Sequence, residues 1–222
     1  MYTLYYSPDA CSLATQVVLH ELDQAVEIKN VQKVENFKAI NPVGAVPVLV
    51  DHNNGEADKA LTEGAAIILY LLNKHENSLL PSTGATRQQG IEHIMFANAT
   101  MHPTYSRLFF IAQNISDDSI HDKKIKQAAF DAAAESISYL WQVVEQKLEQ
   151  QSASESNLEG NFLGGCFLGG ELPSAADIML TVYSRWGASF PVEIPLGPRV
   201  QKMITAVLAM PSFQRALAAE QS

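Results

Sequence analysis

Residues 2–22 read YTLYYSPDACSLATQVVLHEL, a strand pattern that changes into a helix pattern within a few residues. Aromatic and β-branched residues fill positions 2–6 and stop before Pro8, which predicts a β-strand followed by a turn. From Cys11 to Leu22 the apolar residues recur at helical spacing and predict an amphipathic helix. Cys11 therefore falls at the start of this helix, where free amides and the macrodipole favour a thiolate, either its own or that of a ligand. A buried structural cysteine is the alternative.

The alternation of short strands and helices continues to about residue 80. Residues 26–31 and 46–50 predict two further strands, and residues 62–72 predict an apolar helix. A strand, a helix and a strand, followed by more strands and a helix, indicate a small α/β unit of the form βαβ-ββα.

Two positions in this unit offer groups to a ligand. At Val46-Pro47 a cis proline would leave the preceding backbone amide and carbonyl free to pair with an extended ligand, whereas a trans proline at a strand start is the plain alternative. At Thr62-Glu63-Gly64 the helix start offers amides for a carboxylate, and Glu63 offers a carboxylate for an ammonium group. Helix capping alone is the alternative there.

Beyond residue 80 the pattern is almost entirely helical. A polar stretch at 78–85 is typical of a linker, and long helices are predicted behind it at 87–114, with a bend at Pro103, and at 120–150. The stretch 152–170 is rich in Ser, Gly and Asn and predicts a loop. We therefore expect a small α/β domain followed by an all-helical domain.

The composition of the 222 residues excludes several classes of protein. Hydrophobic residues make up 47% and charged residues 18%, which excludes a disordered chain. No apolar run approaches the roughly 20 residues of a membrane-spanning helix, and the first residues lack the basic segment of a signal peptide. A net charge of −9, spread over both halves, argues against nucleic acid as a partner. Cys11 and Cys166 form neither a disulfide framework nor a metal-ligand pattern, so we expect no metal and a cytoplasmic location.

Several of these segments, in this order and at these spacings, resemble the cytosolic glutathione transferases. Residues 5–14 resemble the opening of the bacterial beta class, which usually has Gly where this chain has Asp9. Segments 41–49 and 61–67 match the two glutathione-site motifs of that family. Two further segments resemble the beta-class helix that carries an active-site histidine and the capping box of the helical domain; they are Ala99-Thr100-Met101-His102, followed by Leu108-Phe109, and Leu172-Pro173-Ser174-Ala175-Ala176-Asp177.

The resemblance implies a thioredoxin-like, glutathione-binding domain at 1–79 and an all-helical domain at 86–222 that holds the electrophile. Cys11 would lie beside the glutathione sulfur, and His102 would serve as proton donor or base. The implied glutathione contacts are Lys33 for the glycyl carboxylate, the backbone of Val46 before a cis Pro47, and Glu63 with the amide of Gly64 for the γ-glutamyl group. The family often has Ser at the Gly64 position, so one hydroxyl contact is missing here.

The same resemblance implies that Tyr105, Ser106 and Phe109 line the electrophile pocket. A role in the core is the alternative for these aromatic residues, and a lone histidine such as His102 is by itself more often structural than catalytic.

The implied function is the transfer of glutathione, used as a cosubstrate, to small apolar electrophiles by a homodimer. Two other interpretations stay open. The same site would serve thiol-disulfide reduction through Cys11, or an isomerisation that uses glutathione. A non-catalytic binding protein on the same scaffold is the interpretation from a different class.

Overall fold

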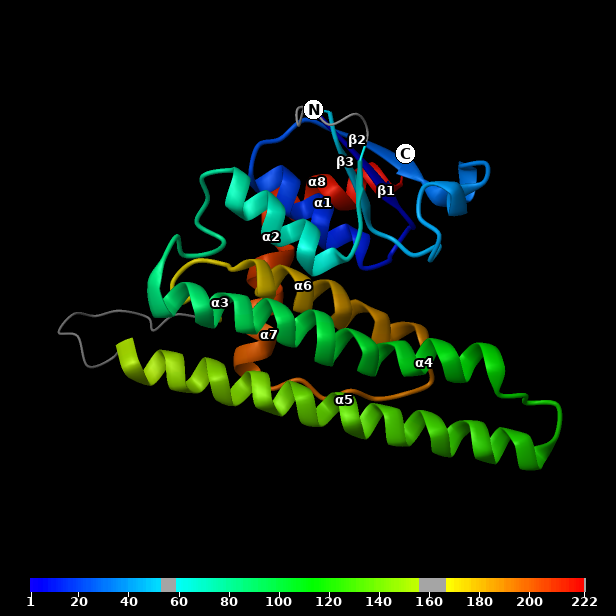
Figure 1. The fold of residues 1–222 in the computed structure, drawn as a ribbon. Helices are drawn as coiled ribbons and strands as arrows, with labels where there is room; N and C mark the ends of the chain where they lie inside the picture. Colours follow the sequence, from blue (N-terminus) through cyan, green and yellow to red (C-terminus); the bar gives the residue numbers. More distant parts are fainter. Residues whose placement is uncertain (53–58, 156–166, 222) are drawn as a thin grey trace.

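The first part of the chain is a four-stranded mixed sheet with helices packed on it, in a computed structural model that describes residues 1–52, 59–155 and 167–221 (Figure 1). The elements follow in the order β1 (Tyr2–Tyr6), α1 (Ser12–Glu21), β2 (Val26–Asn30), β3 (Val48–Asp51), β4 (Ala60–Leu61) and α2 (Gly64–Lys74). The strand order is β2-β1-β3-β4, with β1 parallel to β2 and antiparallel to β3. The predicted βαβ-ββα arrangement is confirmed.

The core of this domain fixes the position at which α1 begins. Leu4 of β1, Leu13 and Val17 of α1, and Ile67 and Leu71 of α2 have no exposed surface. Burying side chains of this size contributes about 1.5–3 kcal/mol each. Because β1 is a central strand and α1 packs against it, the turn between them holds Cys11, the residue before α1, near the C-terminal end of β1.

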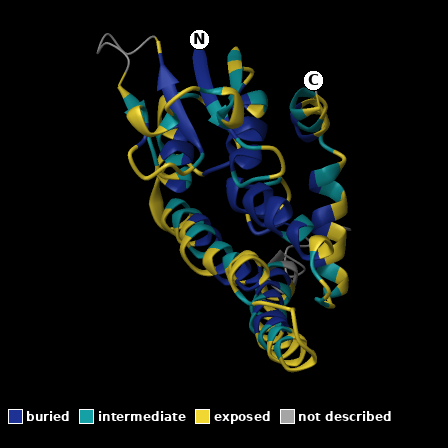
Figure 2. Cartoon of the chain, turned by 90° about the vertical axis from the view of Figure 1, so that its right-hand side faces the viewer, coloured by how far each residue is buried: buried dark blue, intermediate teal, exposed yellow. Residues whose placement is uncertain are grey.

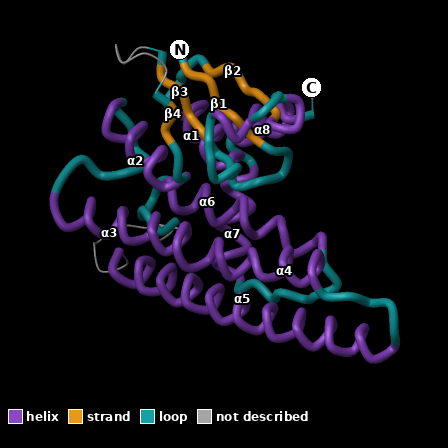
Figure 3. The backbone as a smooth tube through the Cα atoms, turned by 45° about the vertical axis from the view of Figure 1, so that its right-hand side comes forward, coloured by secondary structure: helices purple, strands orange, loops and turns teal. Residues whose placement is uncertain are grey.

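The second part is all helical; in Figure 1 most of it lies beneath the sheet, while its last helix lies beside α1. Its elements are α3 (Gly84–Phe96), a π-helical turn (Ala97–Met101), α4 (His102–Asn114), α5 (Ile120–Glu155), α6 (Ala175–Ser184), a 3₁₀ turn (Arg185–Ser189), α7 (Pro198–Leu208) and α8 (Pro211–Glu220). Figure 3 shows the strands gathered at one end of the molecule, with α5 at the other. No helix among the described residues combines the length and apolar character that crossing a membrane requires.

The predicted long helix at 87–114 is found as three consecutive pieces rather than one. The π-helical turn separates α3 from α4 and ends just before Pro103. Proline has no amide hydrogen for the carbonyl one turn earlier, and the widened turn lies where that hydrogen bond is missing. Helix α5 extends five residues past the predicted end at 150, to Glu155, and most of the predicted loop at 152–170 lies outside the described residues.

Helix α6 runs through the middle of the molecule and is buried along nearly its whole length (Figure 2). Its start is a capping box: Ser174 Oγ accepts from the Asp177 amide, and the Asp177 carboxylate accepts from the Ser174 amide at 2.8 Å. The same carboxylate accepts from the Leu168 amide at 3.0 Å. Burial raises the pKa of Asp177, against these hydrogen bonds, which lower it.

Candidate functional site

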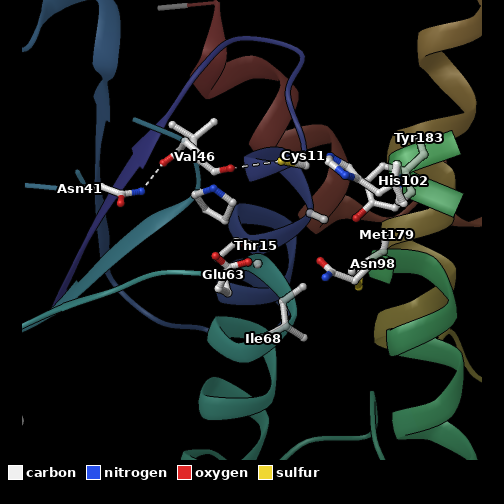
Figure 4. A pocket seen from close by; sticks show the side chains of 15 residues that line it. Cys11, Thr15, Asn41, Val46, Glu63, Ile68, Asn98, His102, Met179 and Tyr183 are labelled. Atoms are coloured by element: carbon white, nitrogen blue, oxygen red, sulfur yellow. Dashed lines mark hydrogen bonds between the residues drawn. The ribbon is translucent and has the colours of Figure 1, made fainter. Parts of the chain in front are cut away.

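A cavity of about 250 Å³ lies where the two parts of the chain meet (Figure 4). Its walls come from the start of α1, the segment before β3, the start of α2, the π-helical turn and α6. Most of the residues expected to hold glutathione or to react with it lie around this cavity, namely Cys11, Val46, Pro47, Glu63, Gly64 and His102.

Cys11 is the N-cap residue of α1, and its thiol donates a hydrogen bond to the Val46 carbonyl oxygen at 3.3 Å. Burial raises the pKa of Cys11 to about 11, while the backbone amides of Cys11 and Ser12 lower it by less. Of the two possibilities that the sequence left open, the helix N-terminus therefore does not make Cys11 itself a thiolate. Desolvation outweighs the helix end, and Cys11 is a protonated hydrogen-bond donor at neutral pH.

The segment before β3 presents its backbone to the cavity. The Val46-Pro47 peptide bond is cis. Asn41 is buried, and its Nδ2 donates to the Ala45 carbonyl oxygen at 2.8 Å, which holds the turn ahead of this bond. Gly44 has a φ of +75°, a conformation that suits a glycine in that turn.

The start of α2 places Glu63 and Gly64 on the same cavity. Glu63 has a φ of +68°. Residues other than glycine rarely adopt such a positive φ, and those that do often lie at functional positions. Its side chain is exposed, and Gly64 behind it lies against the Pro47 ring. The π-helical turn brings Asn98 to the opposite wall, across from Glu63 in Figure 4.

His102 lies beside Cys11 and is held by aromatic rings (Figure 4). Its ring makes edge contacts with Tyr183 and Trp186, at centroid distances of 5.2 and 5.3 Å. Burial lowers the pKa of His102, so the imidazole is neutral at pH 7. Burial also raises the pKa of Tyr183, which keeps its hydroxyl protonated.

A second cavity, of about 360 Å³, adjoins the first. It is lined by the turn at residues 7–10 and by Ser106, Phe109, Trp186 and Ser189, and it shares Cys11 and His102 with the first cavity. Ser106 donates to the His102 carbonyl oxygen at 3.0 Å, which leaves its own side chain tied to the helix. The Cys11 thiol and the His102 imidazole therefore lie between a partly polar cavity and a mainly apolar one.

Two residues expected at the site are placed elsewhere. Tyr105 is 1% exposed and lines neither cavity; its hydroxyl accepts from Trp141 Nε1 at 2.8 Å, and the pair belongs to the helical core. Lys33 is exposed in the 3₁₀ turn that follows β2, and it does not line the first cavity. The structure therefore does not bring Tyr105 or Lys33 to the site.

Further polar side chains line the first cavity besides the expected site residues. Asn98 and Tyr183 line it, and so does Thr15, a buried residue of α1 whose Oγ1 has no hydrogen-bond partner among the described residues. A π-helical turn often marks a functional position, but neither that turn nor an unpaired hydroxyl leaves a signal in hydrophobic spacing.

Asp9 stands at the rim of the second cavity, where the beta class usually has Gly. Its φ of +56° is left-handed, and its carboxylate pairs with Arg185 at 2.8 Å. Trp186 Nε1 donates to the Asp9 carbonyl oxygen at 2.7 Å, and the Asp9 amide donates to Glu220 at 3.0 Å. The turn before Cys11 is thereby fastened to the last helix and to the tryptophan that supports His102.

Comparison with known proteins agrees with this geometry. The family model of the glutathione S-transferase N-terminal domain matches residues 4–79. Over 98% of each chain, the sequence is 29% identical to glutathione S-transferase GST-4.5 of Xanthomonas campestris pv. campestris. A sphingomonad glutathione S-transferase solved with glutathione is 26% identical at a TM-score of 0.73, covering 99% of this chain and 98% of that one. A beta-class glutathione S-transferase of Sphingomonas chungbukensis is 25% identical at a TM-score of 0.74, covering 98% of each chain. Residues 4–79 therefore match a glutathione S-transferase N-terminal domain, and the chain is similar to glutathione S-transferases over nearly its whole length.

Proposed function

We propose that the chain binds glutathione in the first cavity and transfers it to an electrophile held in the second. The observation that carries this proposal is that Cys11 and His102 line both cavities. A glutathione sulfur placed between them faces the second cavity directly, which is the arrangement that bringing a nucleophile and an electrophile together requires.

The first cavity supplies groups that match the parts of glutathione. Glu63 offers a carboxylate to the γ-glutamyl ammonium, and the free amides at the start of α2, beginning with Gly64, suit the adjacent carboxylate. The backbone of Val46 is placed to pair with the cysteinyl residue. Asn98, on the opposite wall, is a further polar contact for the γ-glutamyl end. Lys33 stays a prediction for the glycyl carboxylate and depends on movement of its long side chain.

The transfer step needs the glutathione thiol to lose its proton and its sulfur to form a bond to carbon as the leaving group departs with its electron pair. Because the pKa of Cys11 is raised to about 11, we assign Cys11 the role of hydrogen-bond donor to the glutathione thiolate. The amides at the start of α1 add their dipoles to the same sulfur. Neutral His102 is able to accept the thiol proton or donate to the thiolate, depending on its tautomer.

The thiol-disulfide reductase interpretation is less favoured by the same geometry. A reductase cysteine must attack as a thiolate, whereas the half-buried Cys11 thiol donates to the Val46 carbonyl oxygen and has a raised pKa. We therefore place the chain nearest the beta class of transferases, on the Cys11 and His102 pair. Glutathione is abundant in the reducing cytoplasm, which we propose as the location.

We infer that the working form is a homodimer. Large apolar side chains are exposed on three neighbouring helices: Met95 on α3, Phe110 on α4, and Ile125 and Tyr139 on α5. A contiguous apolar patch is typical of an interaction surface, and the proposed dimer places these side chains in one. Light scattering of the purified chain tests the dimer directly, and a monomeric mass at micromolar concentration would contradict it.

The proposed function is tested by calorimetric titration with glutathione, followed by a conjugation assay with a panel of electrophiles. Saturable binding and turnover are expected, with the Cys11→Ala, His102→Gln double variant losing most of the turnover while glutathione binding stays measurable. Unchanged turnover in the double variant would remove both residues from the mechanism. Binding without turnover of any electrophile would favour an isomerase or a binding protein on this scaffold.

A further inference from the structure

A third cavity, of about 490 Å³, lies beyond the second one at the outer end of the helical domain. Ala112 of α4, Phe130 of α5, Phe190 and Pro191 give it apolar walls, and Lys123 and Lys126 stand at its α5 side. The wall is fastened by Gln127, whose Nε2 donates to the Asp131 side chain at 2.8 Å and to the Pro191 carbonyl oxygen at 3.3 Å. An apolar chamber with cations on one side suits a ligand that is apolar along its length and anionic at one end.

The third cavity adjoins the proposed electrophile site. Ser189 lines both cavities. The Phe109 ring on the side of the second cavity contacts the Phe190 ring on the side of the third, at a centroid distance of 4.9 Å and an angle of 85°. Phe109 is 38% exposed, and this edge-to-face pair joins a ring that lines the second cavity to a ring that lines the third.

The charges around the third cavity leave a positive excess. The Lys126 side chain is only 17% exposed, and its one ion-pair partner among the described residues, Asp117 at 3.5 Å, is 65% exposed. Lys123 makes no ion pair within the part of the chain that the structure describes. Among the residues that line the third cavity, two cations face the single carboxylate of Asp117, while the Asp131 carboxylate bound by Gln127 is not a lining residue. The lining is therefore positive in a chain whose net charge is −9.

The fold also sets how far apart the two ends of such a ligand must lie. His102 and Ala112 are ten residues apart on the same helix, α4. At about 1.5 Å per residue, the third cavity begins about 15 Å along the helix from the reacting centre. A ligand that reacts beside Cys11 and reaches the lysines is therefore long and extended.

We propose that the third cavity is a distal part of the electrophile site and receives the carboxylate end of an elongated apolar electrophile. This inference rests on the function proposed above and names the substrate class of that site. Lys123 and Lys126 bind the anionic end, and the Phe109 and Phe190 rings line the passage for the apolar chain.

The test compares an ω-bromoalkanoic acid long enough to span the two cavities with its methyl ester and with a short homologue, all below their micelle-forming concentrations. In the reaction the glutathione sulfur forms a bond to the terminal carbon, bromide leaves with the bonding electron pair, and the thiol proton passes to solvent. The long acid is expected to have a higher kcat/KM than its ester. The Lys123→Met, Lys126→Met double variant should lower kcat/KM for the long acid about tenfold, through KM, and leave the ester unchanged.

Lys124→Met is the matched control, because Lys124 is an exposed lysine of the same helix that does not line the cavity. A second readout is calorimetric binding of the unreactive long alkanoate, which the double variant should weaken and the control variant should not. Equal turnover of acid and ester by the unaltered chain, or alkanoate binding that the double variant leaves unchanged, would overturn the inference while leaving the transferase function intact. Failure to turn over acid, ester and the general electrophile panel alike would instead overturn the proposed function and, with it, this extension.

Discussion

Replacing Gly64 by Ser should tighten the binding of glutathione. A Cβ atom built on Gly64 lies 3.6 Å from two carbons of the Pro47 ring and 3.8 Å from Asn98 Oδ1. These are ordinary van der Waals separations, so the new side chain fits without displacing its neighbours. Gly64 is the first residue of α2 and does not need a left-handed conformation, so the backbone accepts the change as well.

The size of the effect follows from the group that the serine would meet. A hydroxyl at Gly64 points into the cavity at the α2 amides, where the γ-glutamyl carboxylate is proposed to lie. A hydrogen bond to a charged group contributes about 1.5–3 kcal/mol. Each 1.4 kcal/mol corresponds to a tenfold change, so the dissociation constant of glutathione should fall about 10- to 100-fold.

Calorimetric titration of the reduced protein with glutathione measures this change, with Gly64→Ala as the matched control. Alanine adds the same Cβ without the hydroxyl, so its affinity should stay close to that of the unaltered chain. An unchanged or weaker affinity in the folded serine variant would refute the placement of the γ-glutamyl carboxylate at the start of α2. Equal gains in the alanine and serine variants would show that helix stability, rather than the hydroxyl, is responsible.

Three further predictions concern groups whose surroundings the structure defines. In a Cys166→Ser background, Cys11 should react slowly with iodoacetamide at neutral pH, and the rate should climb until the pH passes about 11, because burial raises its pKa; a plateau near pH 8 would contradict this. Asp177→Ala should lower the free energy of unfolding by about 3 kcal/mol in urea titration at fixed protein concentration, because two buried amides lose their acceptor; a loss below about 1 kcal/mol would show that the site relaxes. Asp9→Gly should change the same free energy by less than about 1 kcal/mol, because relief of the left-handed conformation offsets the exposed ion pair with Arg185; a loss of several kcal/mol would show that the clamp contributes more.

Most of the fold was predictable because the spacing of apolar residues along the chain changes where a strand is followed by a helix. The first domain alternates short strands and helices, and its topology follows from that alternation. The spacing of apolar residues does not reveal local backbone conformations that shift the start of a helix. The helix predicted from residue 62 begins at Gly64, because Glu63 has a left-handed φ that no helix residue adopts. Helices α7 and α8 were not predicted, although each begins with a proline, Pro198 or Pro211, which is a typical start signal of a helix.

The site was predictable only as far as motif resemblance reached. Cys11, Val46, Glu63 and His102 come from four separate segments, and no spacing rule brings them together. Periodicity also cannot tell a cavity from a core when both lie along one helix. Tyr105 illustrates this limit, because its place on α4 suits either, and the Trp141 hydrogen bond that settles its position comes from α5.

The charged residues that line the three cavities explain why the glutathione thiolate and a carboxylate on the electrophile would bind at different places. Among the described residues, no lysine or arginine lines the first or second cavity, whose only charged side chains are Glu63 and Asp9. A glutathione thiolate there is stabilised by dipoles alone: the Cys11 thiol, the amides at the start of α1 and a neutral His102. A carboxylate on the electrophile would gain nothing from these groups and would repel the thiolate. The lysines of the third cavity lie about 15 Å along α4, far enough to hold that carboxylate away from the sulfur while the reacting carbon approaches it.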